Sequence, residues 1–348
     1  MNFAQEIITW YLGNKRDLPW RETSDPYIIW LSEIIMQQTR VEQGTPYFIR
    51  FAENYPTVAD FAAASENEIL NLWQGLGYYS RGRNMHHTAR MVMEEHAGYF
   101  PRKYDELLKL KGVGEYTAAA ISSFSANEAK AVVDGNVYRL LSRYFGIDTP
   151  INSPAGKKIF AELATTVMDK GQAGIYNQAA MEFGSLQCKP VNPVCNICPL
   201  QDACVAYNSN TVHLLPVKIK LKKVRERFFT FIVAEKNGAV LMQKRLEKDI
   251  WLNLYQLPLF ETANAVEAIT LIKDPAFRSV FGNDSKIVKI SAPIKHLLSH
   301  QRLHAQFIQV KDFNDEYALL NGLFYASSTD LKTLAQPKLI FEFLEKFF

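Results

Sequence analysis

All four cysteines of this chain lie in one short stretch that could hold a metal. They are Cys188, Cys195, Cys198 and Cys204, in the pattern C-x6-C-x2-C-x5-C. Zinc sites usually join two close cysteine pairs, and only one close pair occurs here, whereas iron–sulfur clusters are held by four thiolates at varied spacings. The spacing leaves zinc and an iron–sulfur cluster both open, with disulfide bridges as the weakest alternative.

A second candidate site is the turn in LKGVGEYTAAAI, residues 110–121. Gly112 and Gly114 permit positive φ and a close backbone approach. The helix expected from Glu115 directs its free N–H groups and positive dipole end outward, which suits a phosphate, although a plain turn between helices has the same pattern. Some twenty residues later, Asp134 precedes another expected helix, as an N-cap or as a reacting carboxylate.

The elements that must position these residues are of two kinds. Residues 1–204 predict helices, among them PYIIWLSEIIMQQT and SENEILNLWQGLG, where Ser65 and Glu68 have the spacing of a capping box. Residues 205–226 indicate a polar, then basic linker. Residues 227–348 predict an α+β domain with a hairpin at Asn237-Gly238, a strand at LHAQFIQV and a helix in TLAQPKLIFEFLEKFF.

The composition is that of an ordinary globular protein with two or three domains, with 348 residues and 48% hydrophobic residues. A net charge of +3 neither identifies nor excludes a nucleic-acid ligand. The chain shows neither a signal peptide nor a long apolar run, so we expect no membrane segment. We expect a monomer in the cytoplasm, associated with the nucleoid through DNA binding, or in the nucleus if the source has one.

The G-V-G turn, the later aspartate and the cysteine pattern together resemble the iron–sulfur branch of the helix-hairpin-helix DNA glycosylases. WLSEIIMQQTRV, GLGYYSRGRN, VVDGNVYR and NQAAMEFGSLQC are similar to adenine DNA glycosylases of the MutY type, over nearly all of residues 1–205. The resemblance implies an all-α module with a [4Fe–4S] cluster loop and an α+β MutT-like (Nudix-like) domain. It implies a substrate of double-stranded DNA with 8-oxoguanine:adenine or guanine:adenine mispairs.

Excision of adenine calls for an acid that protonates the leaving base and a carboxylate that stabilises the positive sugar. Glu33 lies among apolar residues, where burial would raise its pKa and keep it protonated. The resemblance implies that Glu33 is the acid, that Asp134 is the carboxylate beside the sugar and that Asn136 orients it. Tyr116 stands where the related endonuclease III enzymes carry a strand-cutting lysine, so a monofunctional enzyme is expected.

The resemblance also assigns residues that touch the base and the duplex. The adenine pocket is expected to be lined by Arg16, Leu18, Trp20, Arg21 and Glu182. Contacts with DNA are expected from Gln37, Gln38, Thr39, Tyr78, Lys111, Gly112, Val113 and Gly114. The family's 8-oxoguanine recognition loop, Phe-Ser-His, is here Leu298-Ser299-His300. The Ser299 hydroxyl can donate or accept a hydrogen bond at the damaged base. Leu298, which replaces the family's phenylalanine, has no aromatic ring for stacking.

Three other functions fit parts of this pattern. A bifunctional glycosylase/lyase is disfavoured by Tyr116 and by the long C-terminal domain. A non-catalytic, metal-stabilised DNA-binding protein would leave Glu33 and Asp134 without a role. Nucleotide hydrolysis needs a glycine-led box with an R-E-x-x-E-E core, which residues 225–348 lack. We therefore expect the C-terminal domain to bind and not to hydrolyse.

Overall fold

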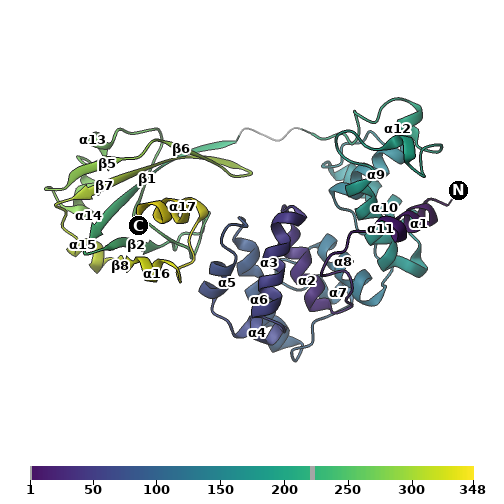
Figure 1. Ribbon diagram of the computed structural model, residues 1–348, viewed down its shortest axis with the longest axis horizontal. Helices are drawn as coiled ribbons and strands as arrows, with labels where there is room; N and C mark the ends of the chain where they lie inside the picture. The colour runs from purple at the N-terminus through teal and green to yellow at the C-terminus, as the bar shows by residue number, and fades with distance from the viewer. Residues whose placement is uncertain (1, 220–223) are drawn as a thin grey trace. The chain divides into compact units, whose positions relative to one another are not determined.

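The computed structural model describes residues 2–219 and 224–348. The chain forms two compact units, one of residues 1–63 and 84–221 and the other of residues 64–83 and 222–348 (Figure 1). The second unit is therefore built from two separate stretches of sequence. None of the helices in the described ranges is long and apolar enough to cross a membrane.

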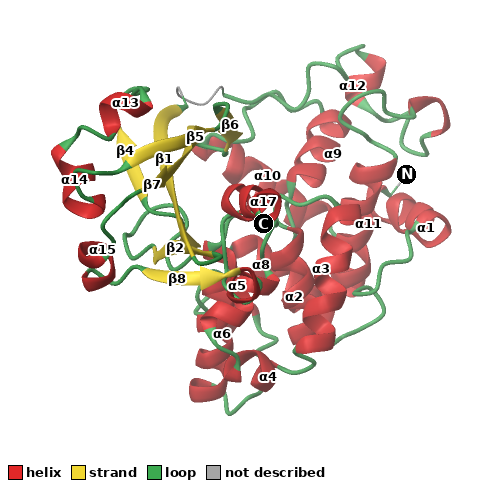
Figure 2. Ribbon diagram, turned by 60° about the vertical axis from the view of Figure 1, so that its left-hand side comes forward, coloured by secondary structure: helices red, strands yellow, loops and turns green. Residues whose placement is uncertain are grey.

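The described part of the first unit contains helices and no strand, as the colours of Figure 2 show. Its helices are α1 (Phe3–Asn14), α2 (Pro26–Met36), α3 (Val41–Asn54), α4 (Val58–Ala63), most of α6 (Ser80–Glu95), α7 (Tyr104–Leu107), α8 (Glu115–Ala126), α9 (Gly135–Phe145), α10 (Pro154–Val167), α11 (Ala173–Leu186) and α12 (Val205–Asn208). Helix α2 packs against α3 and α8. A separate core joins α1, α9, α10 and α11 around Phe160 and Phe183.

The second unit combines a sheet with short helices. Its strands are β1 (Arg225–Lys236), β2 (Ala239–Lys244), β3 (Tyr255–Gln256), β4 (Leu259–Thr262), β5 (Lys286–Ile290), β6 (Ile294–Leu297), β7 (Gln301–Lys311) and β8 (Phe324–Ser327). Its helices are α5 (Glu66–Leu72), α13 (Ala268–Leu271), α14 (Pro275–Phe281), α15 (Glu316–Leu320), α16 (Ser328–Leu331) and α17 (Lys338–Phe347). Strands β1 and β7 run parallel at its centre, and β2, β4, β5 and β6 pair antiparallel with one of them.

Two local sequence signals predicted their elements correctly, and a third predicted a helix that begins later than expected. The capping box of α5 is formed by both Ser65 and Glu68. The Asn237-Gly238 turn joins β1 to β2 with φ of 54° and 77°, values that suit the two central residues of a hairpin turn. The last helix starts only at Lys338, later than the expected segment, because Pro337 precedes it.

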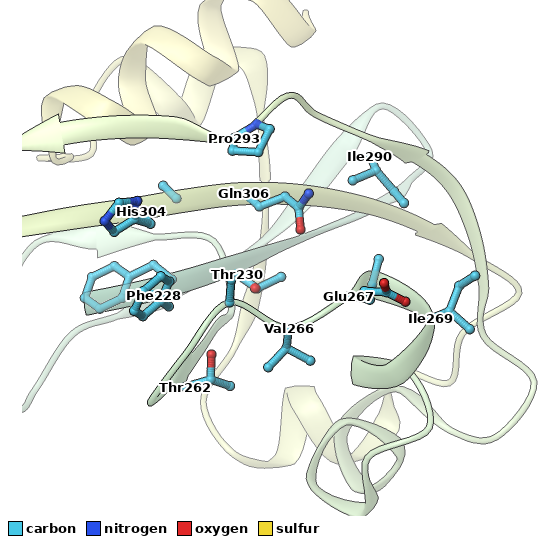
Figure 3. A pocket seen from close by; sticks show the side chains of 14 residues that line it. Phe228, Thr230, Thr262, Val266, Glu267, Ile269, Ile290, Pro293, His304 and Gln306 are labelled. Carbon is cyan, nitrogen blue, oxygen red and sulfur yellow. The ribbon is translucent and has the colours of Figure 1, made fainter. Parts of the chain in front are cut away.

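One face of the central sheet is covered only in part. Helix α14 packs through Phe277 and Phe281 on Ile232 and Ile308. On the same face, Phe228 and His304 stack with ring centroids 4.8 Å apart and border a hollow of about 460 Å³ (Figure 3). Glu267 is the one carboxylate among the lining residues.

Candidate active site

Two helices bring a carboxyl group and a phenol together in the first unit. Helix α2 starts with Asp25 as N-cap and Pro26 in its first turn, and its buried residues include Ile29 and Trp30. Glu33 lies on this helix. The Tyr116 hydroxyl, from the first turn of α8, donates a 2.7 Å hydrogen bond to Oε2 of Glu33. Glu33 thus lies on a largely apolar helix, but its carboxyl group has a polar partner.

This environment changes the acidity of both groups. Burial raises the pKa of Glu33 to about 7, against the lowering effect of the Tyr116 hydrogen bond and with a further raising effect from the charge of Asp134. Burial and the charge of Glu33 raise the pKa of Tyr116 well above its ordinary value. Tyr116 is thus a neutral donor near neutral pH, and Glu33 is a carboxyl that can carry a proton there.

Asp134 is both an N-cap and a member of this site. Its Oδ1 accepts from the backbone N–H groups of Asn136 and Val137, at 2.9 and 2.8 Å, at the start of α9. Its Oδ2 accepts from Nδ2 of Asn136 at 2.7 Å. Burial raises the pKa of Asp134, and the three hydrogen bonds oppose that shift. Asn136 therefore contacts both oxygens of this carboxylate.

Arg139 connects this carboxylate to the cysteine loop, and the sequence analysis did not single it out. Its Nη2 donates to Oδ1 of Asn136 at 2.8 Å, and its Nε donates to the carbonyl oxygen of Cys188 at 2.7 Å. Arg139 is buried and follows Asn136 by three residues on one helix. Residues at that spacing are neighbours on a helix surface, and this spacing was the available signal in VVDGNVYR.

Glu182 anchors the segment that was expected to line the base pocket. Only 1% of its side chain is exposed, and it pairs with Arg16 at 2.7 Å and with Arg21 at 2.6 Å. Burial alone would raise the pKa of Glu182, but the hydrogen bonds from these arginines lower the pKa to about 2. Leu18 is buried, and Trp20 packs edge-on against Phe48. Glu182 is therefore an ionised anchor of Arg16 and Arg21.

The glycine turn has the expected form, with one difference. Gly112 has a φ of +77°, and an added Cβ would lie 2.9 Å from the side chain of Asn84. Gly114 has a φ of −94°, so of the two glycines that permit positive φ only Gly112 adopts it. Its Cβ position has no atom within 4 Å, which leaves the backbone at the start of α8 open to a ligand. Lys111 is exposed and Val113 is buried.

The three residues after α2 lie outside the helix, and the first of them contacts α8. Nε2 of Gln37 donates to Oγ1 of Thr117 at 3.3 Å. Gln38 is exposed with a φ of 55°. Oγ1 of Thr39 donates to the carbonyl oxygen of Gln37 at 3.2 Å. These residues are thus held in a non-helical turn, with Gln37 against the helix that carries Tyr116.

Tyr78 and the proposed recognition loop belong to the second unit. The Tyr78 hydroxyl and the Ser299 hydroxyl form a hydrogen bond. Leu298, Ser299 and His300 lie in the turn between β6 and β7, which is closed by a 2.9 Å bond from the Leu298 N–H to the carbonyl oxygen of Gln301. Tyr78, Trp251 and this turn line a cavity of about 440 Å³. The structure thus brings Tyr78 together with the loop.

The four cysteines line one small cavity of about 30 Å³, together with Arg143 and apolar residues. All four are free thiols, so the disulfide alternative is not realised. Nη1 of Arg143 lies 3.5 Å from the sulfur of Cys188. Within residues 2–219 and 224–348, no three His, Cys, Asp or Glu side chains converge as closely as a single metal ion requires. The structure thus gathers the four thiols at one place beside Arg143.

Comparison with known proteins gives two family matches. The model for the HhH-GPD superfamily of base excision DNA repair proteins matches residues 31–166, and the model for the NUDIX domain matches residues 229–346. The expected fold class is confirmed by these matches. The first described unit supplies the helical region, and the sheet of the second supplies the α+β Nudix-like domain.

Individual relatives agree with these matches. The adenine DNA glycosylase of Buchnera aphidicola subsp. Schizaphis graminum is 36% identical over 309 residues, covering 87% of this chain and 85% of that protein. The adenine DNA glycosylase of Rattus norvegicus is 42% identical over 214 residues, covering 59% of this chain and 42% of that protein. The structure of a thermostable thymine-DNA glycosylase is 31% identical, with a TM-score of 0.55, over 60% of this chain and 95% of that chain.

Proposed function

This chain belongs to the adenine DNA glycosylases, base excision repair enzymes that hydrolyse N-glycosidic bonds, and we propose that it excises adenine mispaired with 8-oxoguanine or guanine, with Glu33 as the acid. The observation that carries this proposal is the group formed by Glu33, Tyr116 and Asp134. One of its two carboxyl groups can hold a proton near pH 7. The other is held by three hydrogen bonds that favour its charged form.

The proposed reaction uses these two groups in turn. Glu33 gives its proton to a ring nitrogen of adenine as the bond to C1′ breaks, so that the bonding electron pair leaves with a neutral base. The sugar becomes an oxocarbenium-like cation, and the ionised Asp134 stabilises that charge. Water then adds to C1′, and the proton that it loses returns to the ionised Glu33, which restores the acid. Asn136 orients Asp134 throughout, since it bonds both carboxylate oxygens.

Tyr116 supports hydrolysis without strand cleavage. A lyase of this kind needs an amine that forms an imine with the sugar, and a phenol cannot form one. The Tyr116 hydroxyl instead donates a hydrogen bond to Glu33. We infer a monofunctional glycosylase, in which position 116 tunes the acid.

The remaining assignments concern how the base and its partner are bound. Taking a base out of the stack costs a few kcal/mol, and we propose that Gln37 and Tyr78 enter the duplex at that gap. The adenine pocket is formed by the segment that Glu182 anchors through Arg16 and Arg21. The open backbone at Gly114 binds a DNA phosphate. Ser299, with Leu298 and His300 beside it, reads the 8-oxoguanine.

The four cysteine thiolates would hold a [4Fe–4S] cluster. Four free thiols around one cavity, in a chain that belongs to this family, support this assignment. When bound, the cluster supplies iron–sulfur bonds that fix this loop. Arg139 then connects the loop to Asn136 through the Cys188 carbonyl oxygen.

A duplex with adenine opposite 8-oxoguanine tests the proposal. Incubation followed by hot alkali should cut the adenine strand, and incubation alone should leave it intact. Asp134→Asn should still bind the duplex and excise adenine slower by orders of magnitude, because asparagine cannot supply the charge but remains a good N-cap. Asp169→Asn, at the cap of another helical turn, is the matched control. Strand cutting without alkali, or rapid excision by Asp134→Asn, would refute the assignment.

A further inference from the structure

Three carboxamide side chains of the segment 64–83 hydrogen-bond to the backbone of one loop in the second unit. Asn67 and Asn71 lie on α5, and Gln74 lies just beyond its end. Successive members are four and three residues apart, so they share one face. All three are half-buried. Their partners are backbone groups of residues 332–336, the loop between α16 and α17.

The hydrogen bonds form a ladder along that loop. Nδ2 of Asn67 donates to the carbonyl oxygen of Thr333 at 2.9 Å, while its Oδ1 accepts from the N–H of Ala335 at 3.2 Å. Nδ2 of Asn71 donates to the carbonyl oxygen of Lys332 at 3.0 Å. Oε1 of Gln74 accepts from the N–H of Gln336 at 3.2 Å. All four hydrogen bonds are to backbone atoms of the loop, so they do not depend on its side chains.

The C-terminal end of the segment, residues 79–83, is also hydrogen-bonded to the rest of the unit. The Tyr79 hydroxyl donates to the carbonyl oxygen of Gln336 at 3.0 Å, and Gln336 is 1% exposed. Nη1 of Arg83 donates to the carbonyl oxygen of Leu252 at 2.9 Å. The residues between Gln74 and Tyr79 are therefore held from both sides.

Those residues have a backbone that needs such support. Gly75, Gly77 and Tyr78 have φ of 100°, 70° and 45°. Positive φ is uncommon for a non-glycine residue and persists only where its surroundings hold it. This conformation places the Tyr78 hydroxyl on the Ser299 hydroxyl. The orientation of Tyr78 toward the recognition loop therefore depends on the anchors at either side.

We propose that Asn67, Asn71 and Gln74 are positioning residues for opposite-base specificity. They act through Tyr78, which they hold against Ser299, and so set how strongly the enzyme prefers 8-oxoguanine over guanine opposite adenine. This inference rests on the proposed function, since it takes the Tyr78–Ser299 contact as the reader of the damaged base.

Asn67→Asp and Asn71→Asp are the direct tests. Each keeps the size of the side chain but can turn an acceptor oxygen, in place of the donor, toward the carbonyl of Thr333 or Lys332. Affinities are measured for two duplexes that carry 2′-fluoroadenosine, which resists excision because fluorine disfavours the sugar cation, opposite 8-oxoguanine or guanine. The affinity ratio should fall by about tenfold in the double variant, the size of one base-edge contact. Single-turnover excision from a saturated G:A duplex should change less than about twofold.

Two comparisons separate this role from a loss of stability. Asn321→Asp is the matched control, because that amide donates within its own turn to the carbonyl oxygen of Tyr317, and the affinity ratio should stay at its wild-type value. Ser299→Ala should lower the ratio by itself. Adding it to Asn67→Asp/Asn71→Asp should cause little further loss, because coupled residues are not additive.

Three possible results of these measurements would each refute a different part of the proposal. If Ser299→Ala lowers the ratio and the asparagine variants lower only the melting temperature, the amides are structural and this inference is wrong. A further full loss in the combined variant would overturn the route through Tyr78 and Ser299. If Ser299→Ala leaves the ratio unchanged, the proposed reader itself fails, and the inference fails with it.

Discussion

Replacing Tyr116 by phenylalanine tests the assignment of the acid. In the wild type, burial and the charge of Asp134 raise the pKa of Glu33, and the hydrogen bond from Tyr116 lowers it, with a net value of about 7. The hydrogen bond is 2.7 Å long and ends on Oε2 of the carboxyl group. An ionised carboxylate accepts a hydrogen bond more strongly than the protonated acid. Removing the donor therefore disfavours ionisation and raises the pKa of Glu33.

The size of this shift follows from the energy of the hydrogen bond. A hydrogen bond to a charged group contributes about 1.5–3 kcal/mol, and one pKa unit corresponds to about 1.4 kcal/mol. The pKa of Glu33 should thus rise by about 1–2 units in Tyr116→Phe. Because the reaction uses the protonated form, wild-type excision should fall about tenfold per pH unit above the pKa of about 7. In the variant this decline should begin at a pH about 1–2 units higher.

The assay is single-turnover excision of adenine opposite 8-oxoguanine as a function of pH, with enzyme in excess and the product strand revealed by alkali. Tyr99→Phe is the matched control, since Tyr99 is 80% exposed, and its profile should coincide with that of the wild type. If the decline in excision rate at high pH occurs at the same pH in Tyr116→Phe as in the wild type, Glu33 is not the titrating acid. A decline that begins at a lower pH would contradict the predicted rise in the pKa of Glu33.

Three other changes have definite expected results. Glu182→Gln breaks a buried ion pair, which costs about 3 kcal/mol, so calorimetry should show a melting temperature lower by about 6–12 °C; an unchanged value, as expected for exposed Asp17→Asn, would contradict the anchoring role. Cys198→Ser should lose the brown colour and the iron, about four atoms per chain in the wild type; stoichiometric zinc in the wild type would refute the cluster. Tyr116→Lys should form a borohydride-trappable adduct with the sugar, and failure to trap one would mean that position 116 does not face the sugar.

Local signals explain how much of the structure was predictable from the sequence. The Ser65 capping box, the Asn237-Gly238 hairpin and the cap at Asp134 each depend on residues within a few positions of one another. The apolar neighbours of Glu33 in the sequence likewise predicted the burial that raises its pKa. Such features are encoded by short-range backbone and packing preferences, so they can be recognised without knowing the fold.

The features that were missed or mistaken depend on tertiary contacts. Arg16 and Glu182 are separated by 166 residues, and no spacing rule connects them. The amides at Asn67 and Asn71 look like ordinary helix-surface residues until the loop at 332–336 lies against them. In both cases the hydrogen-bond partner is far away in the sequence and is brought close only by folding.

The double role of Asp134 has a consequence for inheritance. The N-cap of α9 tolerates asparagine as well as aspartate, so we expect a single-base change that encodes asparagine at 134 to yield a protein that folds and still binds the mispair. Such a protein would occupy the mispair without excising the adenine. We expect it to raise the mutation rate even beside a wild-type copy, whereas deletion of that one copy would leave the wild-type enzyme free to repair the mispair.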